Sequence, residues 1–356
     1  MAGLEALHGL RALAGERVDL TLIAPENEFV YRPLAVREPF DVGRVRQVPL
    51  TRAARQAGAD FLGATVTAVD LEDKVASTSD GGALEYDALL IAVGATARPA
   101  IPNAITWDDR ADSVGGLVRD IDEGYSHSVV VVIPPGPAWP LRGYELALFI
   151  AREAEGMSAD HRTTLVTPQP PPLEFLGQRV VELVSNELQR AGVIELAAER
   201  VEVERDHAST VVLHPSGQRI QADRILALPA LRGQPIPGIP ARDDGFIEVD
   251  EHCRVRGADG VWAAGDATGF PLKSGGFAAA QADAAAEDIA ATAGAAVEAR
   301  PFEAREEMAG LPAGRYLKEQ LAGSDDEGLT TDLPVTGVPV LTYLARDLSA
   351  GWRAQS

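Results

Sequence analysis

Apolar and polar positions alternate along the first 100 residues with the spacing of helices and short strands. Leucines three residues apart predict one apolar helix face that ends near Gly15. Turn residues at 79–82 separate two of the short strand-like pieces that follow. The pattern predicts a helix over 4–14, a buried strand over 18–23, a helix over about 50–57, a β-meander and an apolar strand over 88–93.

The same order of elements returns after the proline-rich stretch 97–107 (ARPAIPNAITW), which suits a linker. Residues 128–133 (SVVVVI) predict a strand covered on both faces, because β-branched residues fit a buried parallel sheet. The pattern then predicts a helix over 143–155, a strand over 163–168, a helix over 175–191, a second meander and a long helix over 276–293. We therefore expect two α/β units, the second inserted in the first.

The composition limits the possible binding partners of the protein and its expected cellular compartment. The formal net charge of −21 argues against nucleic acid or an anionic membrane surface as the main partner. No stretch has the length and apolarity of a membrane span, and no signal peptide is visible, so we expect a cytoplasmic protein. The single cysteine, Cys253, excludes an internal disulfide, and the six histidines show no metal-ligand spacing.

Three segments carry a resemblance to a known family. They are YDALLIAVGATARP (86–99), GVWAAGDAT (260–268) and FPLKSGGFAAAQADAAAEDIA (270–290). In this order they resemble the flavin-dependent pyridine nucleotide-disulfide oxidoreductases, in the branch of type II NADH dehydrogenases and sulfide:quinone reductases. The resemblance covers about residues 1–300. It implies two Rossmann-like, three-layer units with a β-meander each, and FAD as the cofactor.

The implied domains follow from this resemblance. Residues 1–100 and 241–300 would form a discontinuous FAD-binding domain. Residues 101–240 would form an NAD-binding-like domain, and 301–356 a C-terminal segment. Apolar residues at helical intervals over 338–348 match the place of a membrane anchor in quinone-reducing relatives, or a helix packed on the flavin domain.

The resemblance places the flavin at the end of the strand that leads into Asp266. The Asp266 carboxylate would accept a hydrogen bond from a ribityl hydroxyl, and Gly265 would let the backbone approach. The helix beginning at Gly275 and Gly276 would direct its free N–H groups at the flavin pyrimidine edge. The alternatives are an ordinary Gly-Asp turn and an alanine-rich core helix.

Further cofactor contacts are implied around these two motifs. Lys273 lies one turn before the helix, where it would touch flavin or substrate unless it is a solvated lysine. Glu26 lies 23 positions beyond Gly3, near the spacing at which an acid meets a ribose; the alternative is a solvated loop residue. The remaining implied contacts are Gly3, Pro33, Val66, Gly94 and Phe277.

The beginning of the chain departs from the family pattern. Relatives start with an apolar strand and Gly-x-Gly-x-x-Gly before the first helix, whereas in this chain Gly3 matches the third glycine and nothing matches the first two. We expect Met1 to be internal to the true gene, with the missing strand and glycines encoded upstream. A missing central strand would leave its neighbours with unpaired backbone groups, and a pyrophosphate would lose its cradle at the helix N-terminus.

The second glycine turn also departs from the pattern. Gly136, Gly143 and Glu145 match a Gly…Gly-x-Glu arrangement, but four prolines and Trp139 replace small residues. Prolines lack N–H donors for phosphate, so NAD(P)H binding is doubtful. Cys253 is expected to be a buried structural cysteine, and a single cysteine excludes sulfide oxidation by a cysteine pair.

The predicted function is an FAD-dependent oxidoreductase. It would pass two electrons from an unidentified small-molecule donor through flavin to a small acceptor, with a quinone as one candidate. No residue is assigned a catalytic role, and no metal is expected. The alternative is a degenerate, non-catalytic relative that keeps the fold for binding or assembly. Peripheral membrane contact and a homodimer are further interactions that the resemblance suggests.

Overall fold

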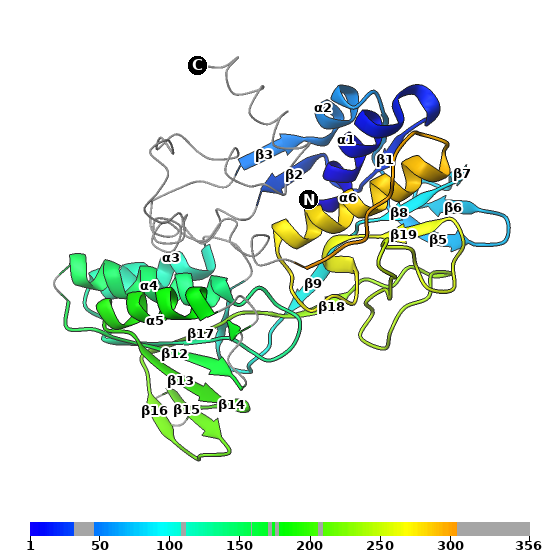
Figure 1. Ribbon diagram of the computed structural model, residues 1–356. Helices are drawn as coiled ribbons and strands as arrows, with labels where there is room; N and C mark the ends of the chain where they lie inside the picture. The colour runs from blue at the N-terminus through cyan, green and yellow to red at the C-terminus, as the bar shows by residue number, and fades with distance from the viewer. Residues whose placement is uncertain are drawn as a thin grey trace, which may run out of the picture.

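The computed structural model shows two α/β units that lie side by side (Figure 1). It describes residues 1–31, 46–107, 112–157, 159–169, 173–174, 178–205 and 209–304. The first unit contains α1 (Ala2–Ala14), β1 (Thr21–Ile23), β2 (Glu28–Tyr31), β3 (Arg46–Pro49), α2 (Leu50–Gln56), β4 (Asp60–Leu62), β5 (Val66–Asp70), β6 (Val75–Thr78), β7 (Ala83–Glu85), β8 (Leu89–Ile91), β19 (Val261–Ala263) and α6 (Gly275–Thr292). The second contains β10 (Ile105–Thr106), α3 (Asp112–Asp122), β11 (Ser128–Val132), α4 (Leu141–Gly156), β12 (Arg162–Pro168), α5 (Gln178–Arg190), β13 (Ile194–Ala198), β14 (Arg200–Arg205), β15 (Ser209–His214), β16 (Arg219–Gln221) and β17 (Arg224–Ala227).

The second unit is built on a five-stranded parallel sheet in the order β10-β17-β11-β12-β13. Helices α3, α4 and α5 cover one face, and the antiparallel strands β14–β16 cover the other (Figure 1). The central strand β11 shows why its sequence is continuously apolar. Val129 and Val131 pack toward the helices, while Val130 and Val132 pack toward β14–β16. Both faces of β11 are therefore buried, as the sequence predicts.

The first unit has the same three kinds of layer. Helices α1 and α6 lie beside each other over the pair β8–β19, and the antiparallel strands β5–β7 lie on the opposite side (Figure 1). Alternate residues of β19 face the two sides. Trp262 packs with the helices, whereas Val261 and Ala263 join the apolar cluster that includes Val69 of β5. These layers confirm the predicted α/β class with Rossmann-like units.

The parallel strands of the first unit form two separate pairs. β1 pairs with β4, and β8 pairs with β19, each in parallel. Within the described part of the chain no strand lies between β1 and β8 to join them. Helix α1 contacts both pairs. Leu4 and Leu7 share an apolar cluster with residues of β1, and Ala2 and Ala6 share another with Trp262 of β19.

The chain passes between the units through two strands that pair with each other. β9 (Ala95–Arg98) leaves the first unit, β18 (Ala230–Gly233) returns to it, and the two are antiparallel. The stretch 97–107 was predicted to be a linker, but it contributes the end of β9 and all of β10. Its prolines, Pro99 and Pro102, lie between these two strands.

One helix was not predicted, and some predictions fall outside the described residues. Helix α3 has buried Val114, Leu117 and Ile121 at helical spacing, but Gly115 and Gly116 interrupt the pattern. Pro33 and the helical pattern over 338–348 lie outside the described residues.

Candidate cofactor site

The turn after β19 is shaped by Gly265. Its backbone φ is +76°, in the region that favours glycine. A Cβ at this position would lie 3.1 Å from Ala2 Cβ and 3.3 Å from Ala278 Cβ. Gly265 thus lets the ends of α1 and α6 meet at the end of β19. The next residue, Asp266, is half-buried within the 3₁₀ turn Gly265–Ala267.

A buried glutamine fixes this turn, and the sequence interpretation missed it. The Gly265 N–H donates to Gln281 Oε1 at 2.7 Å, and Thr268 Oγ1 donates to the same oxygen at 3.2 Å. Gln281 and Thr268 are both buried. The signal was present, because Gln281 is a polar residue within an alanine-rich apolar run. A buried amide needs partners, and this one holds the backbone that presents Asp266.

The N-terminus of α6 lies beside the same turn. Ser274 is its N-cap, and Ser274 Oγ accepts a hydrogen bond of 3.3 Å from the Phe277 N–H. Helix α1 begins nearby, because a Cβ on Gly3 would lie 3.3 Å from Ala92 Cβ, just after β8. Two helix N-termini, each with a positive dipole end, therefore lie close to the ends of β8 and β19.

Lys273 is held inside the protein rather than exposed to solvent. Its Nζ donates to the Thr268 carbonyl at 2.6 Å and to the Asp266 carbonyl at 3.3 Å. The ammonium also lies 4.2 Å from the centroid of the Phe246 ring. Burial lowers the pKa of Lys273 to about 8, although the charge of Asp266 acts in the opposite direction. The solvated alternative for this lysine is therefore wrong.

Phe277 lies in an aromatic cluster that joins the two units. Its ring is 5.3 Å from that of Phe270 and 6.3 Å from that of Trp139, centroid to centroid, and Phe302 contacts Phe270. Trp139 comes from the second glycine turn. The backbone beside it forms a parallel bridge between Ala138 and Leu272. Within this cluster, Trp139 and Phe277 are buried.

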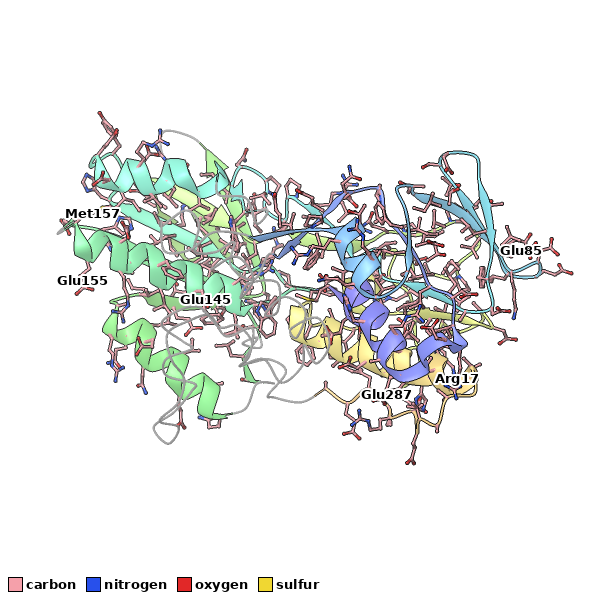
Figure 2. The ribbon with its side chains drawn as sticks, turned by 90° about the horizontal axis from the view of Figure 1, so that it is seen from above. Arg17, Glu85, Glu145, Glu155, Met157 and Glu287 are labelled. Atoms are coloured by element: carbon pink, nitrogen blue, oxygen red, sulfur yellow. The ribbon has the colours of Figure 1, made fainter. Side chains whose placement is uncertain are left out.

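The end of the second glycine turn is packed against protein, whereas Gly136 has no heavy atom within 4 Å of an added Cβ. Trp139 is 9 % exposed, and the bridge to Leu272 ties the turn to the segment before α6. Gly143 serves helix packing, because a Cβ there would lie 2.4 Å from Ile133 Cγ1. Helix α4 begins next to the first unit and runs outward, toward Glu155 and Met157 (Figure 2). The N-terminus of α4 follows directly after Trp139. The burial of Trp139 at this helix end supports the prediction that NAD(P)H binding is doubtful.

The structure brings together six of the predicted site residues and leaves others apart. Gly3, Gly265, Asp266, Lys273, Gly276 and Phe277 lie around the ends of α1, β19 and α6. Gly94 follows β8, with a φ of +75° and no heavy atom within 4 Å of an added Cβ. Glu26 is exposed after β1, and Val66 begins β5. No hydrogen bond within the described ranges joins Glu26 or Val66 to the other six.

Cys253 is fully buried, as predicted. Burial, together with the charges of Asp250 and Asp288, raises the pKa of its thiol to about 12. A thiol with this pKa is protonated near neutral pH and is a poor nucleophile. Cys253 therefore belongs to the core beneath α6.

The chain belongs to the pyridine nucleotide-disulphide oxidoreductase family, whose pattern matches residues 1–288. This confirms the predicted family, and with it the class of FAD-dependent oxidoreductases.

Individual relatives are identical to the chain at about a quarter of the aligned positions. It is 28 % identical over 287 residues to the ferredoxin reductase component of a chlorobenzene dioxygenase from Cupriavidus sp. (strain PS12), which covers 78 % of this chain and 67 % of that protein. It is 28 % identical over 263 residues to an NADH dehydrogenase-like protein of Mycobacterium tuberculosis, covering 64 % and 62 %. The matches thus span about two thirds of the length of these relatives.

Among solved structures, the sulfide:quinone oxidoreductase of Aquifex aeolicus has the same fold. The TM-score is 0.70 at 18 % identity, with 81 % of this chain and 74 % of that chain covered. At this identity the likeness concerns the fold alone. No helix in the described residues is both long enough and apolar enough to cross a membrane.

The described residues fit the flavin end of FAD. Asp266 offers a half-buried carboxylate at a strand end, and α6 offers the first N–H groups of an 18-residue helix beside it. Gly94 leaves open space beside its backbone. For a pyrophosphate, the described residues supply the N-terminus of α1 and the approach at Gly3.

Proposed function

We propose that this protein passes two electrons from a small-molecule donor to a small oxidant, a quinone being one candidate, by way of FAD held at Asp266 and α6. When bound, the flavin would supply reversible two-electron chemistry. The observation that supports the proposal is the position of the turn at Gly265 and Asp266. It lies between the N-termini of α1 and α6.

The protein residues would act on the cofactor in three ways. Asp266 would accept a hydrogen bond from a ribityl hydroxyl, which fixes the position of the cofactor chain. The positive end of α6 would stabilise negative charge on the flavin pyrimidine edge. Lys273 would keep the turn in place through its bonds to the Asp266 and Thr268 carbonyls.

The packing of the second glycine turn bears on the electron donor. Trp139 and the Ala138–Leu272 bridge occupy the turn in which a pyridine nucleotide phosphate would need backbone N–H groups. We therefore propose a donor other than NAD(P)H. Such a donor would reach the flavin by a route that does not pass through this turn.

The test is the flavin content of the protein purified from cells grown with riboflavin. We expect Asp266→Ala to lower bound flavin by about tenfold or more, because a charge-assisted hydrogen bond is lost. Asp259→Ala is the matched control, since Asp259 is exposed just before β19. Wild-type flavin content in the Asp266→Ala protein would refute the assigned role. Rapid bleaching of the wild-type flavin by NADH would refute the proposed exclusion of that donor.

A second candidate function is a non-catalytic relative that keeps the fold for binding or assembly. The packed turn at Trp139 favours it, because an inactive protein has no need of a nucleotide site. A folded wild-type protein that stays colourless when incubated with excess FAD would support this candidate over the enzyme.

A further inference from the structure

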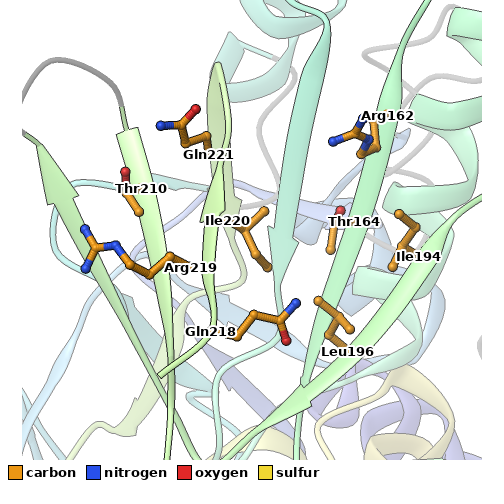
Figure 3. Close-up of a pocket in the computed structure, with 9 residues that line it drawn as sticks. All are labelled: Arg162, Thr164, Ile194, Leu196, Thr210, Gln218, Arg219, Ile220 and Gln221. Atoms are coloured by element: carbon orange, nitrogen blue, oxygen red, sulfur yellow. The ribbon is translucent and has the colours of Figure 1, made fainter. Parts of the chain in front are cut away.

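A cavity of about 600 Å³ opens in the second unit, on the face of its sheet that carries β14–β16 (Figure 3). Arg162 and Ile194, the first residues of β12 and β13, line it together with residues of β15 and β16. It therefore lies at the amino ends of the parallel strands. The turn that holds Trp139 follows the carboxyl end of β11, so the cavity is separate from the candidate cofactor site.

Three aliphatic side chains form the wall of this cavity. Leu196 and Ile194 come from β13, and Ile220 comes from β16 on the other side (Figure 3). Ile194 is 45 % exposed, which is high for a large aliphatic residue at the start of a sheet strand. The residue after it, Glu195, points to the opposite face, where it accepts a hydrogen bond from Tyr144. The alternation of β13 thus directs Ile194 and Leu196 into the cavity.

The cavity carries an uncompensated positive charge. Within the described part of the chain, no acidic group or hydrogen-bond acceptor contacts the Arg162 guanidinium. The other lining arginine, Arg219, is paired with Glu204 and points away from the wall (Figure 3). None of the nine lining residues is acidic, although the whole chain has a net charge of −21. The remaining polar groups include the amides of Gln218 and Gln221, which are neutral.

We propose that this cavity binds a small organic molecule with one carboxylate on an aryl or short alkyl body. The carboxylate would accept hydrogen bonds from Arg162, whose planar fork matches two oxygens. The body would cover Ile194, Leu196 and Ile220, and the Gln218 amide would lie at the far end. The volume lies within the range of small-molecule sites, and the lining combines three aliphatic side chains with polar ones.

The experiment measures the binding of 4-phenylbutyrate, as the probe, to the full chain by isothermal titration calorimetry. We expect saturable binding of one molecule per chain, and weaker binding of the neutral 4-phenylbutyramide. Arg162→Gln should weaken carboxylate binding by about tenfold or more. Arg162→Lys should recover part of it, because a cation remains. Methyl NMR signals of Ile194, Leu196 and Ile220 should shift during the titration.

Arg219→Gln is the matched control, because Arg219 lines the same cavity but is already paired. Its affinity should stay within about twofold of wild type. Leu196→Trp, which places a larger side chain against the cavity wall, should weaken binding while the circular dichroism spectrum stays unchanged. Absence of saturable binding to the wild type would overturn the proposal. Equal affinity of wild type and Arg162→Gln, or of carboxylate and amide, would overturn it as well.

Discussion

The two units of the molecule repeat one order of elements but differ at the centre of the sheet. In the second unit, β11 pairs with β12 on one side and β17 on the other, and both neighbours are joined through it. In the first unit, β1 corresponds to β12, because each follows a helix, and β8 corresponds to β17, because each follows a meander. Strands β1 and β8 pair only with β4 and β19 within the described part of the chain.

The burial of the strand residues differs between the two units in the same way. Four consecutive valines of β11, Val129 to Val132, are at most 1 % exposed. Leu22 of β1 and Leu90 of β8 are only half-buried. Helix α1 holds the two pairs together by packing on both. A central strand therefore buries its neighbours as well as itself, and a helix that contacts both pairs replaces only part of this burial.

The largest expected effect on stability comes from a substitution in β11, the central strand of the second unit. Val131→Asp places an unpaired carboxylate in a fully buried strand, and it should cost about 4 kcal/mol or more of unfolding free energy. Leu22→Asp, at the half-buried position in β1, should cost about 1–2 kcal/mol. Urea unfolding followed by circular dichroism measures both. Equal losses would mean that β1 is as deeply buried as β11.

A smaller effect compares two helices, α4 of the second unit and α1 of the first. Gly143→Ala in α4 brings a Cβ to 2.4 Å from Ile133 Cγ1, and this overpacking should cost about 1–3 kcal/mol. Gly3→Ala in α1 meets only Ala92 Cβ at 3.3 Å, so the change should stay within about 0.5 kcal/mol. Thermal melts of the two variants test this. A larger loss for Gly3→Ala would show that α1 is packed as tightly as α4.

A further expected effect concerns pH. Asp283 of α6 faces Glu5 of α1 and Glu287 of its own helix, and Arg300 lies nearby with the opposite charge. Burial, followed by the charges of Glu5 and Glu287, raises the pKa of Asp283 to about 8. Only the folded state therefore keeps this proton between about pH 4 and 8, so the stability of the wild type falls as pH rises through that range.

The substitution Asp283→Asn removes this pH dependence of stability, because an amide does not ionise. The variant should match the wild type near pH 4, and its stability should increasingly exceed that of the wild type as the pH rises toward 8. Urea midpoints measured from pH 4 to 9 give the difference curve. A flat curve would show that Asp283 ionises with its ordinary pKa. Asp122→Asn, at the exposed end of α3 in the second unit, is the control for the Asp-to-Asn substitution itself.

The sequence predicted the parts of the fold in which periodicity is uninterrupted. The valines of β11 and the alanine-rich α6 were found with nearly their final bounds. Helix α3 was missed because Gly115 and Gly116 weaken helical propensity, although Val114 and Leu117 are buried. The strands of 97–107 were missed because Pro99 and Pro102 predicted a linker. Pairing with distant partners, β18 and β17, decides those strands.

The candidate site was predictable where a motif fixes the backbone. Gly265 and the Ser274–Gly276 start of α6 lie together because the strand and helix run consecutively. The orientation of Lys273 was not predictable, since its partners are backbone carbonyls that only the folded turn presents. The role of Gln281 depends on a contact 16 residues away.

The paired strands β9 and β18 carry both passages of the chain between the units. A two-stranded ribbon bends across its face more easily than it shears, because shearing breaks the hydrogen bonds along its length. The hydrogen bonds between β9 and β18 therefore oppose sliding of one unit along the other. The contact between the Trp139 and Phe277 rings is a second connection between the units, far along the chain from the two strands.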